Sequence, residues 1–222
     1  MSNIYQIAID GPSGSGKSTL AKGVSAKLGI MYLDTGAMYR TCGLAAIKAG
    51  IDPKNPEQVK ELLDKTSVEV KFSEGQQHMI LNGEDVTGFI RTGEVSMAAS
   101  SVSAHPFVRE AMVQMQRAIA ADQSFVLDGR DIASKVLPDC KYKFFLTASS
   151  EKRAERRLKE LEERGDKSQT YEEVLKDIIQ RDKQDSERAA SPLIKVADAI
   201  EINTDEIGIE ETLETLLSYI KE

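Results

Sequence analysis

Short apolar runs alternate with longer helix-patterned segments in the opening part of the chain. Residues 5–10 form a brief apolar run that ends at a glycine, and a helical pattern follows over residues 17–28. A second apolar run at residues 30–33 precedes helix-like sequence over residues 37–49. Apolar strands without polar alternation are typical of a parallel sheet that is buried on both faces. The pattern therefore predicts a β–α–β–α start to a parallel α/β domain.

The same alternation returns in the second half of the chain. The further strand candidates are residues 124–127, 142–146 and 199–202. The helical patterns cover residues 149–164, 171–190 and 208–220, and the last of these is amphipathic. We therefore expect a sheet of five parallel strands with helices on both faces.

One segment in the middle of the chain breaks this alternation. Its short strands, joined by turns at Gly75 and at Asn82–Gly83, are expected at residues 68–72, 79–81 and 84–86. Asn-Gly between short strands is the strongest local signal for a hairpin. We therefore expect residues 66–92 to form a small antiparallel insert in a core made of residues 1–65 and 93–222.

A glycine-rich turn separates the first strand from the first helix. The sequence Gly11-Pro-Ser-Gly-Ser-Gly-Lys17-Ser18 matches the Walker A pattern, and its glycines allow backbone N–H groups to curl around an anion. The positive end of the following helix dipole points to the same place. Lys17 is expected to reach the β- and γ-phosphates of a nucleoside triphosphate, and the Ser18 hydroxyl to coordinate magnesium. The predicted ATP-binding residues of the loop are Gly11, Pro12, Ser13, Gly14, Ser15, Gly16, Lys17, Ser18 and Thr19.

Composition narrows the class of protein. The formal charge of −7 argues against a general nucleic-acid binder, because phosphate backbones select basic surfaces. Cys42 and Cys140 lie far apart and read as reduced thiols of a cytosolic protein. The first residues lack the pattern of a signal peptide, and no apolar run approaches the roughly 20 residues that span a membrane. We therefore expect a soluble cytoplasmic protein with no nucleic-acid or membrane partner.

A P-loop identifies what is bound and leaves the reaction open. A regulatory GTPase would carry an Asn-Lys-x-Asp guanine reader, which the sequence lacks, and the Asp-x-x-Gly matches at 85–88 and 205–208 lie in the wrong contexts. A helicase would normally be larger and more basic. A kinase of a neutral alcohol needs a carboxylate base, whereas a monophosphate kinase needs several cations to bring two anions together. The positions of the arginines therefore discriminate between these classes.

Arginines recur where ligands of open α/β sheets bind, beyond the carboxyl ends of strands. Arg181, Asp185 and Arg188 share the spacing of one face of a predicted helix. The other arginines are Arg153 and Arg157 on the preceding helix, Arg40 after the second strand, and Arg130, which with Asp131 follows a Walker B-like strand ending in Asp128. The set favours a P-loop kinase of a small anionic acceptor. A nucleotide-dependent switch protein remains the alternative.

Four motifs of the chain resemble those of the bacterial cytidylate kinase family. They are Gly11-Pro-Ser-Gly-Ser-Gly-Lys-Ser-Thr19, Asp34-Thr-Gly-Ala-Met-Tyr-Arg40, Asp128-Gly-Arg-Asp-Ile132 and Arg181-Asp-x-x-Asp-x-x-Arg188, in the family's order and nearly end to end. The resemblance implies a P-loop fold with an enlarged monophosphate-binding region and a short lid around residues 150–167. It implies transfer of phosphate from ATP, with Mg²⁺, to CMP or dCMP and poorly to UMP, in a protein expected to be a monomer. A kinase of UMP or of another monophosphate stays open.

The resemblance also implies roles for individual residues. Arg40 and Arg130 are similar to the clamps on the CMP phosphate, and Ser100, Arg109 and Asp131 match the positions that read cytosine. Thr35 stands where the family often has serine. The remaining positions are Arg181 and Asp185 for the ribose, Arg188 between acceptor and transferred phosphate, and Arg153 and Arg157 over the triphosphate. The implied catalytic residues are Lys17, Arg130, Arg181 and Arg188. Ala133 replaces a glycine common in the family, and its Cβ is expected to shift Asp131 slightly.

Overall fold

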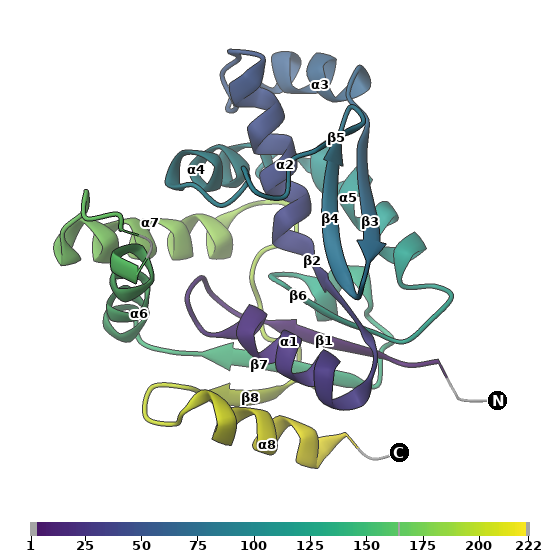
Figure 1. Cartoon of the computed structure of the whole chain (residues 1–222), viewed down its shortest axis with the longest axis vertical. Helices are drawn as coiled ribbons and strands as arrows, with labels where there is room; N and C mark the ends of the chain where they lie inside the picture. The colour runs from purple at the N-terminus through teal and green to yellow at the C-terminus, as the bar shows by residue number, and fades with distance from the viewer. Residues whose placement is uncertain (1–3, 164, 221–222) are drawn as a thin grey trace. The chain divides into compact units, whose positions relative to one another are not determined.

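The structure, a computed structural model, describes residues 4–163 and 165–220 (Figure 1). The chain divides into two compact units. The first unit is Met1–Ile30 with Phe125–Glu222, and the second unit is Met31–Ser124. In the described part of the chain, helices long and apolar enough to cross a membrane are absent.

The main sheet contains the five predicted strands. They are β1 (Gln6–Asp10), β2 (Met31–Asp34), β6 (Phe125–Gly129), β7 (Tyr142–Thr147) and β8 (Ile200–Asn203), and their order is β2-β6-β1-β7-β8. Strand β1 pairs in parallel with both β6 and β7, and β8 pairs in parallel with β7. Ile7, Ile9 and Phe144 are fully buried, as expected for strands covered on both faces. The predicted parallel sheet is confirmed.

The helices of the first unit are α1 (Lys17–Leu28), α6 (Ser150–Glu163), α7 (Tyr171–Glu187) and α8 (Ile209–Tyr219). Helices α1 and α8 lie side by side (Figure 1). Leu213 of α8 packs directly over Gly23 of α1. Helices α6 and α7 pack through an apolar cluster of their own, made of Ala154, Leu161, Val174 and Ile178. A capping box between Thr170 and Glu173 fixes the start of α7.

Two helix ends differ from the prediction. Helix α6 is described as far as Glu163, and the predicted last residue, Arg164, lies outside the described residues. The predicted helix over 171–190 ends early, at Glu187, so Arg188 is not on the helical face of Arg181 and Asp185. Arg188 has an extended backbone with ψ of 140°, and the chain soon reaches Ser191-Pro192, which disfavours helix.

The second unit contains the predicted antiparallel sheet. Its strands β3 (Val68–Ser73), β4 (Gln76–Leu81) and β5 (Glu84–Asp85) pair in the order β3-β4-β5. Asn82 and Gly83 both have positive φ, 50° and 85°, as a tight hairpin turn requires. The sheet lies inside the segment 66–92, while the compact unit that contains it is larger, so the predicted domain boundaries stay a prediction.

The helices of the second unit are α2 (Thr35–Lys48), α3 (Pro56–Asp64), α4 (Gly93–Val102) and α5 (Pro106–Ile119). Of these, only α2 was predicted as a whole. The Asn55 side chain caps α3 and the Thr92 side chain caps α4, so both starts carried a readable signal. Gly43 lets α2 approach α4 closely, because a Cβ there would lie 2.6 Å from the backbone nitrogen of Ala99.

Candidate active site

The glycine-rich loop closes tightly on itself after β1. Gly11 has φ of 147°, and a Cβ at this position would lie 2.1 Å from the carbonyl oxygen of Leu146. The Pro12 carbonyl accepts hydrogen bonds from Ser15 Oγ at 3.0 Å and from Lys17 Nζ at 2.5 Å. Only glycine permits this close approach to β7, which explains why the motif needs that residue at its first position.

The Lys17 ammonium lies buried at the start of α1. Burial lowers the pKa of Lys17 well below its usual value, and the nearby charge of Arg130 lowers it further. The carboxylates of Asp128 and Asp10 act in the opposite direction. The first turn of α1 contains no acidic residue, so its positive end keeps its attraction for an anion. The glycine-rich loop, the start of α1 and Lys17 together form a site that is suited to a phosphate group.

Ser18 and Asp128 meet although they are far apart in sequence. The Ser18 hydroxyl donates a hydrogen bond of 2.8 Å to Asp128 Oδ2, at the end of the buried strand β6. The prediction placed Ser18 at a metal and read Asp128 as the end of a Walker B strand. A hydroxyl and a carboxylate oxygen side by side are ligands that Mg²⁺ prefers, so this residue pair fits that ion.

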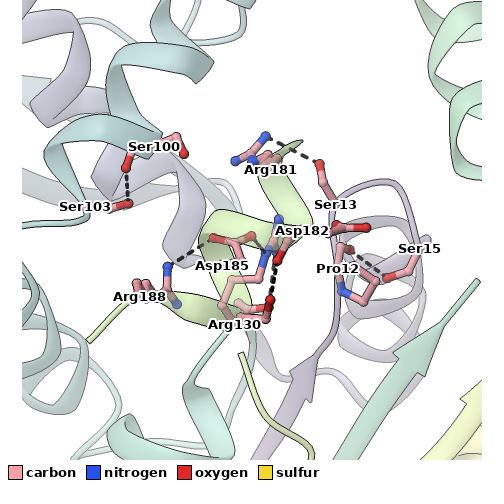
Figure 2. A network of polar contacts seen from close by, with 12 residues as sticks. Pro12, Ser13, Ser15, Ser100, Ser103, Arg130, Arg181, Asp182, Asp185 and Arg188 are labelled. Atoms are coloured by element: carbon pink, nitrogen blue, oxygen red, sulfur yellow. Dashed lines mark hydrogen bonds and ion pairs between the residues drawn. The ribbon is translucent and has the colours of Figure 1, made fainter. Parts of the chain in front are cut away.

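Asp185 on α7 holds two arginines (Figure 2). Its Oδ2 accepts from Arg130 Nε at 2.8 Å, and its Oδ1 accepts from Arg188 Nη1 at 3.1 Å. Burial raises the pKa of Asp185, but the charges of Arg130, Arg181 and Arg188 outweigh that effect and hold it below its usual value. Arg188 reaches this carboxylate because its extended backbone turns the chain, and its Nε also donates to the Ser191 carbonyl at 2.7 Å.

Two further arginines contact the glycine-rich loop at Ser13. Arg181 Nη1 donates to Ser13 Oγ at 3.4 Å, a contact drawn as a dashed line in Figure 2. Arg153 Nη1 donates to the Ser13 carbonyl at 3.1 Å. Arg153 is buried and also forms a two-pronged ion pair with Asp182, at 3.0 and 2.6 Å. Arg157 is directed elsewhere and pairs with Glu160 along its own helix at 3.2 Å.

In the second unit, Asp34 also holds two arginines. Its Oδ1 caps α2 by accepting from the Ala37 amide at 2.9 Å. Its Oδ2 accepts from Arg40 Nη2 at 2.8 Å and from Arg91 Nη2 at 3.0 Å. Burial raises the pKa of Asp34, but the two arginines outweigh it and hold this pKa below its usual value.

The predicted base-reading residues of the second unit are linked through Ser103. Its hydroxyl donates to the Ser100 carbonyl at 3.0 Å, and its own carbonyl accepts from Arg109 Nη1 at 3.3 Å. The Arg109 guanidinium is buried and lies 5.1 Å from the ring centroid of Tyr39, a cation–π distance. Thr35 is buried at the first residue of α2.

The predicted site residues thus fall into both units. The loop residues and Arg130, Asp131, Arg153, Arg157, Arg181, Asp185 and Arg188 belong to the first unit, and Thr35, Arg40, Ser100 and Arg109 belong to the second. Arg153 and Arg181 contact the glycine-rich loop at Ser13, while Thr19 at the end of the motif is exposed. Asp185 brings Arg130 and Arg188 together by accepting a hydrogen bond from each.

Sequence reasoning assigned no role to several polar partners. They are Asp10, Asp34, Arg91, Ser103 and Asp182. Asp34 carried a readable signal, because an aspartate before a helical pattern is a typical N-cap. The contacts of Asp10, Arg91 and Asp182 join distant segments, which no local pattern reveals. Ser103 bonds to residues three and six positions away.

Comparison with known proteins agrees with this architecture. A model of the family described as "Cytidylate kinase" matches residues 7–222. A cytidylate kinase of Shouchella clausii is 46% identical over 222 residues, which is 100% of this chain and 98% of the relative. One of Fervidobacterium nodosum is 47% identical over 217 residues, covering 98% of this chain and 96% of the relative.

A solved structure has the same fold. It is an uncharacterized protein from Eubacterium ventriosum, with a TM-score of 0.53 at 16% identity, and the match covers 97% of this chain and 98% of that one. At this identity the likeness concerns the fold alone. The family follows from the sequence match, which spans the glycine-rich loop, Asp128, Asp185 and the arginines around it. The chain belongs to the cytidylate kinase family.

Proposed function

We propose that this chain is an ATP-dependent nucleoside monophosphate kinase that transfers the γ-phosphoryl group of ATP to CMP or dCMP. The observation that carries the proposal is the match to cytidylate kinases over the full chain at 46–47% identity. The glycine-rich loop with buried Lys17 supports the donor half of the reaction. The arginines held by Asp185 support transfer between two anions.

The glycine-rich loop is the proposed site of the triphosphate. Backbone N–H groups of the loop, which every residue but Pro12 provides, would surround the phosphates, and Lys17 would follow the charge of the transferred group. Ser18 and Asp128 would hold the Mg²⁺ that accompanies ATP. That ion, when bound, neutralises charge on the phosphate oxygens. Arg153 already contacts the loop at Ser13, which supports its role on the donor side, and Arg157 would approach from the same helix.

The proposed transfer needs no general base, because the acceptor is itself an anion at neutral pH. Its phosphate would be clamped by Arg40 and Arg130. Arg181 and Asp185 would contact the ribose, and Arg188 would bridge the acceptor and the transferred phosphoryl group. Lys17 would stabilise the charge that develops in the transition state, together with the three arginines Arg130, Arg181 and Arg188. The ion pairs of Asp185 support this proposal, because they orient two of these arginines in advance.

Recognition of the acceptor base follows from hydrogen-bond chemistry. Cytosine carries an exocyclic amine donor beside a ring-nitrogen acceptor, whereas uracil carries a carbonyl beside an N–H donor. An ionised Asp131 can only accept and would therefore select the amine, while Arg109 can only donate and suits the ring nitrogen. We assign supporting contacts to Ser100 and Thr35. Uracil would place two acceptors face to face, at a cost of about 1–3 kcal/mol.

A coupled assay with ATP and a panel of monophosphates tests the proposal. We expect CMP and dCMP to be phosphorylated well and UMP poorly, with slow ADP release when no acceptor is present. ADP release that does not depend on CMP would indicate a switch protein or an unrelated hydrolase. Preferred turnover of UMP or of another monophosphate would instead reassign the acceptor.

The base assignment has its own test in Asp131→Asn. The amide can donate or accept, so the preference for CMP over UMP should shrink by about one decade or more while phosphate transfer survives. Full retention of the preference in a folded variant would move base reading to Ser100 and Arg109. Because both cysteines are free thiols and the formal charge is −7, we further propose a cytoplasmic enzyme without a nucleic-acid partner. The family resemblance also leads us to propose a monomer.

A further inference from the structure

Asp10 is a buried carboxylate that the proposed mechanism does not use. It is the last residue of β1, is 2% exposed, and stands in register opposite Gly129 of β6. Its Oδ1 accepts a hydrogen bond of 2.9 Å from the Ile132 amide, and its Oδ2 accepts one of 2.8 Å from the Ala133 amide. One side chain therefore joins the strand that feeds the glycine-rich loop to a segment more than a hundred residues away.

The two amides that Asp10 binds open a short π-helix, Ile132–Val136. The Asp131 side chain does not cap this turn, and the carboxylate of Asp10 takes that role from a neighbouring strand. Within the turn, the Asp131 carbonyl accepts from the amides of Lys135 and Val136, at 2.9 and 3.1 Å. The backbone that follows Asp131 is thus held, and short π-helical turns are frequent at functional sites.

The ionised form of Asp10 is disfavoured by its burial. Burial raises the pKa of Asp10 to about 6, and the two amides only partly offset that effect. The neighbouring Asp131 carboxylate raises this pKa as well, while Lys17 lowers it. A carboxylate is the side chain that can accept from two consecutive amides at once without offering a donor, which explains its use here.

We propose that Asp10 is a positioning residue for acceptor recognition, whose carboxylate fixes the Arg130–Asp131 segment relative to the glycine-rich loop. Because Gly11 follows Asp10 directly, the residue that leads into the donor loop also carries the carboxylate that holds the segment proposed to bind the acceptor. The inference rests on the proposed function. It predicts that loss of the carboxylate harms acceptor recognition more than donor binding.

The test is Asp10→Asn, whose amide can satisfy only one of the two backbone donors. We expect the KM for CMP to rise about tenfold or more, the KM for ATP to change by less than about threefold, and the preference for CMP over UMP to shrink. Ile9→Val is the matched control, because it weakens the same buried strand and should lower Tm without altering either KM. If Asp10→Asn does not fold, Asp10→Ser replaces it, with the same expectation.

The pH profile separates positioning from simple destabilisation. Lowering the pH through about 6 should protonate Asp10 in the wild type. The KM for CMP should therefore rise further in the wild type than in Asp10→Asn. The CMP phosphate also titrates near pH 6, but identically for both proteins. The titratable groups that face Asp10 are Asp131, Lys17 and the Cys140 thiol, and all three are kept in both proteins.

Two outcomes decide between the proposals. Equal increases in both KM values, or none, with parallel pH profiles would overturn the positioning role. A wild-type enzyme that does not phosphorylate CMP would instead overturn the proposed function. In that case Asp10→Asn is compared with wild type on the monophosphate that the acceptor panel identifies.

Discussion

Asp185 and Asp34 each hold two arginines, one aspartate in each unit, but they are built differently. Asp185 gives a separate oxygen to each guanidinium and pairs with Arg130, 55 residues away in sequence. One oxygen of Asp34 accepts the hydrogen bond that caps α2. The other oxygen accepts from both Arg40, six residues away, and Arg91. Each aspartate thus holds one arginine that is near in sequence and one that is distant, but only Asp34 also caps a helix.

Asp185 and Asp34 are buried alike, but one arginine of each pair differs in burial. The side chains of Asp185 and Arg188 are 9% and 8% exposed, so their charges have little access to water. Arg91, on Asp34, is 48% exposed and can be solvated when its partner is lost. Charges taken out of water depend on their partners far more than charges at the surface. The Asp185 cluster should therefore tolerate neutralisation much less well.

The largest expected effect belongs to Asp185→Asn. It removes the carboxylate charge that two guanidinium groups share, at a cost of about 3 kcal/mol in the free energy of unfolding. We expect kcat/KM to fall roughly 10²-fold, because these arginines lose their fixed orientation. Urea unfolding and steady-state kinetics measure both quantities. Glu187→Gln, on the exposed end of the same helix, is the control, and similar behaviour of the two variants would break the comparison.

Asp34→Asn should have a smaller effect. Asparagine caps helices as well as aspartate does, so the cap is kept while the charge and the acceptor for Arg40 and Arg91 are lost. We expect about 1 kcal/mol of destabilisation. Asp34→Ala removes the cap as well and should lose about 1 kcal/mol more. Circular-dichroism melts of both variants measure the difference. A loss in Asp34→Asn equal to that in Asp185→Asn would show that burial does not set the ranking.

Acid should affect both clusters in the same direction. A carboxylate with a lowered pKa stabilises the fold above its unfolded value of about 3.9, and that stability is lost as pH falls through the folded value. The pKa values of Asp185 and Asp34 are both lowered, so stability should decline below about pH 4. Urea unfolding between pH 5 and pH 3 should therefore show a shallower decline in Asp185→Asn than in the wild type.

The smallest expected effect is that of Arg91→Gln. This side chain is half exposed, and exposed ion pairs contribute about 0.2–1 kcal/mol. We expect a loss of about 0.5 kcal/mol, close to that of Lys48→Gln at the exposed pair with Glu84. Thermal melts of the two variants provide the comparison. A loss above about 2 kcal/mol would make Arg91 an equal member of the Asp34 cluster.

Local signals account for the parts of the fold that the sequence predicted well. The helix expected over residues 17–28 matches α1, because Gly16 and Gly29 end it on both sides with left-handed backbone. The turn at Asn82–Gly83 likewise identifies its own hairpin. The end of α7 was wrong because the helical pattern continued past Glu187, whereas the Ser191-Pro192 step stops it.

The sequence identified candidate residues of the site but not the contacts that they make. The arginines were found by their spacing and by the motifs around them. That Arg153 pairs with Asp182, or that Asp10 caps the turn after Asp131, depends on segments that meet only in the folded chain. Sequence periodicity identifies which face a residue is on, but not which charge will lie opposite it.

The buried Lys17 has a consequence for measurements of nucleotide affinity. Its pKa is lowered by burial and by Arg130, and the approach of phosphate oxygens at the proposed donor site would raise it again. Wherever the solution pH lies above the pKa of the free protein, binding must draw a proton from the buffer. The heat measured by calorimetry would then depend on the ionisation enthalpy of the buffer, and affinity would weaken as pH rises. Titrations in two buffers at one pH would count the protons taken up.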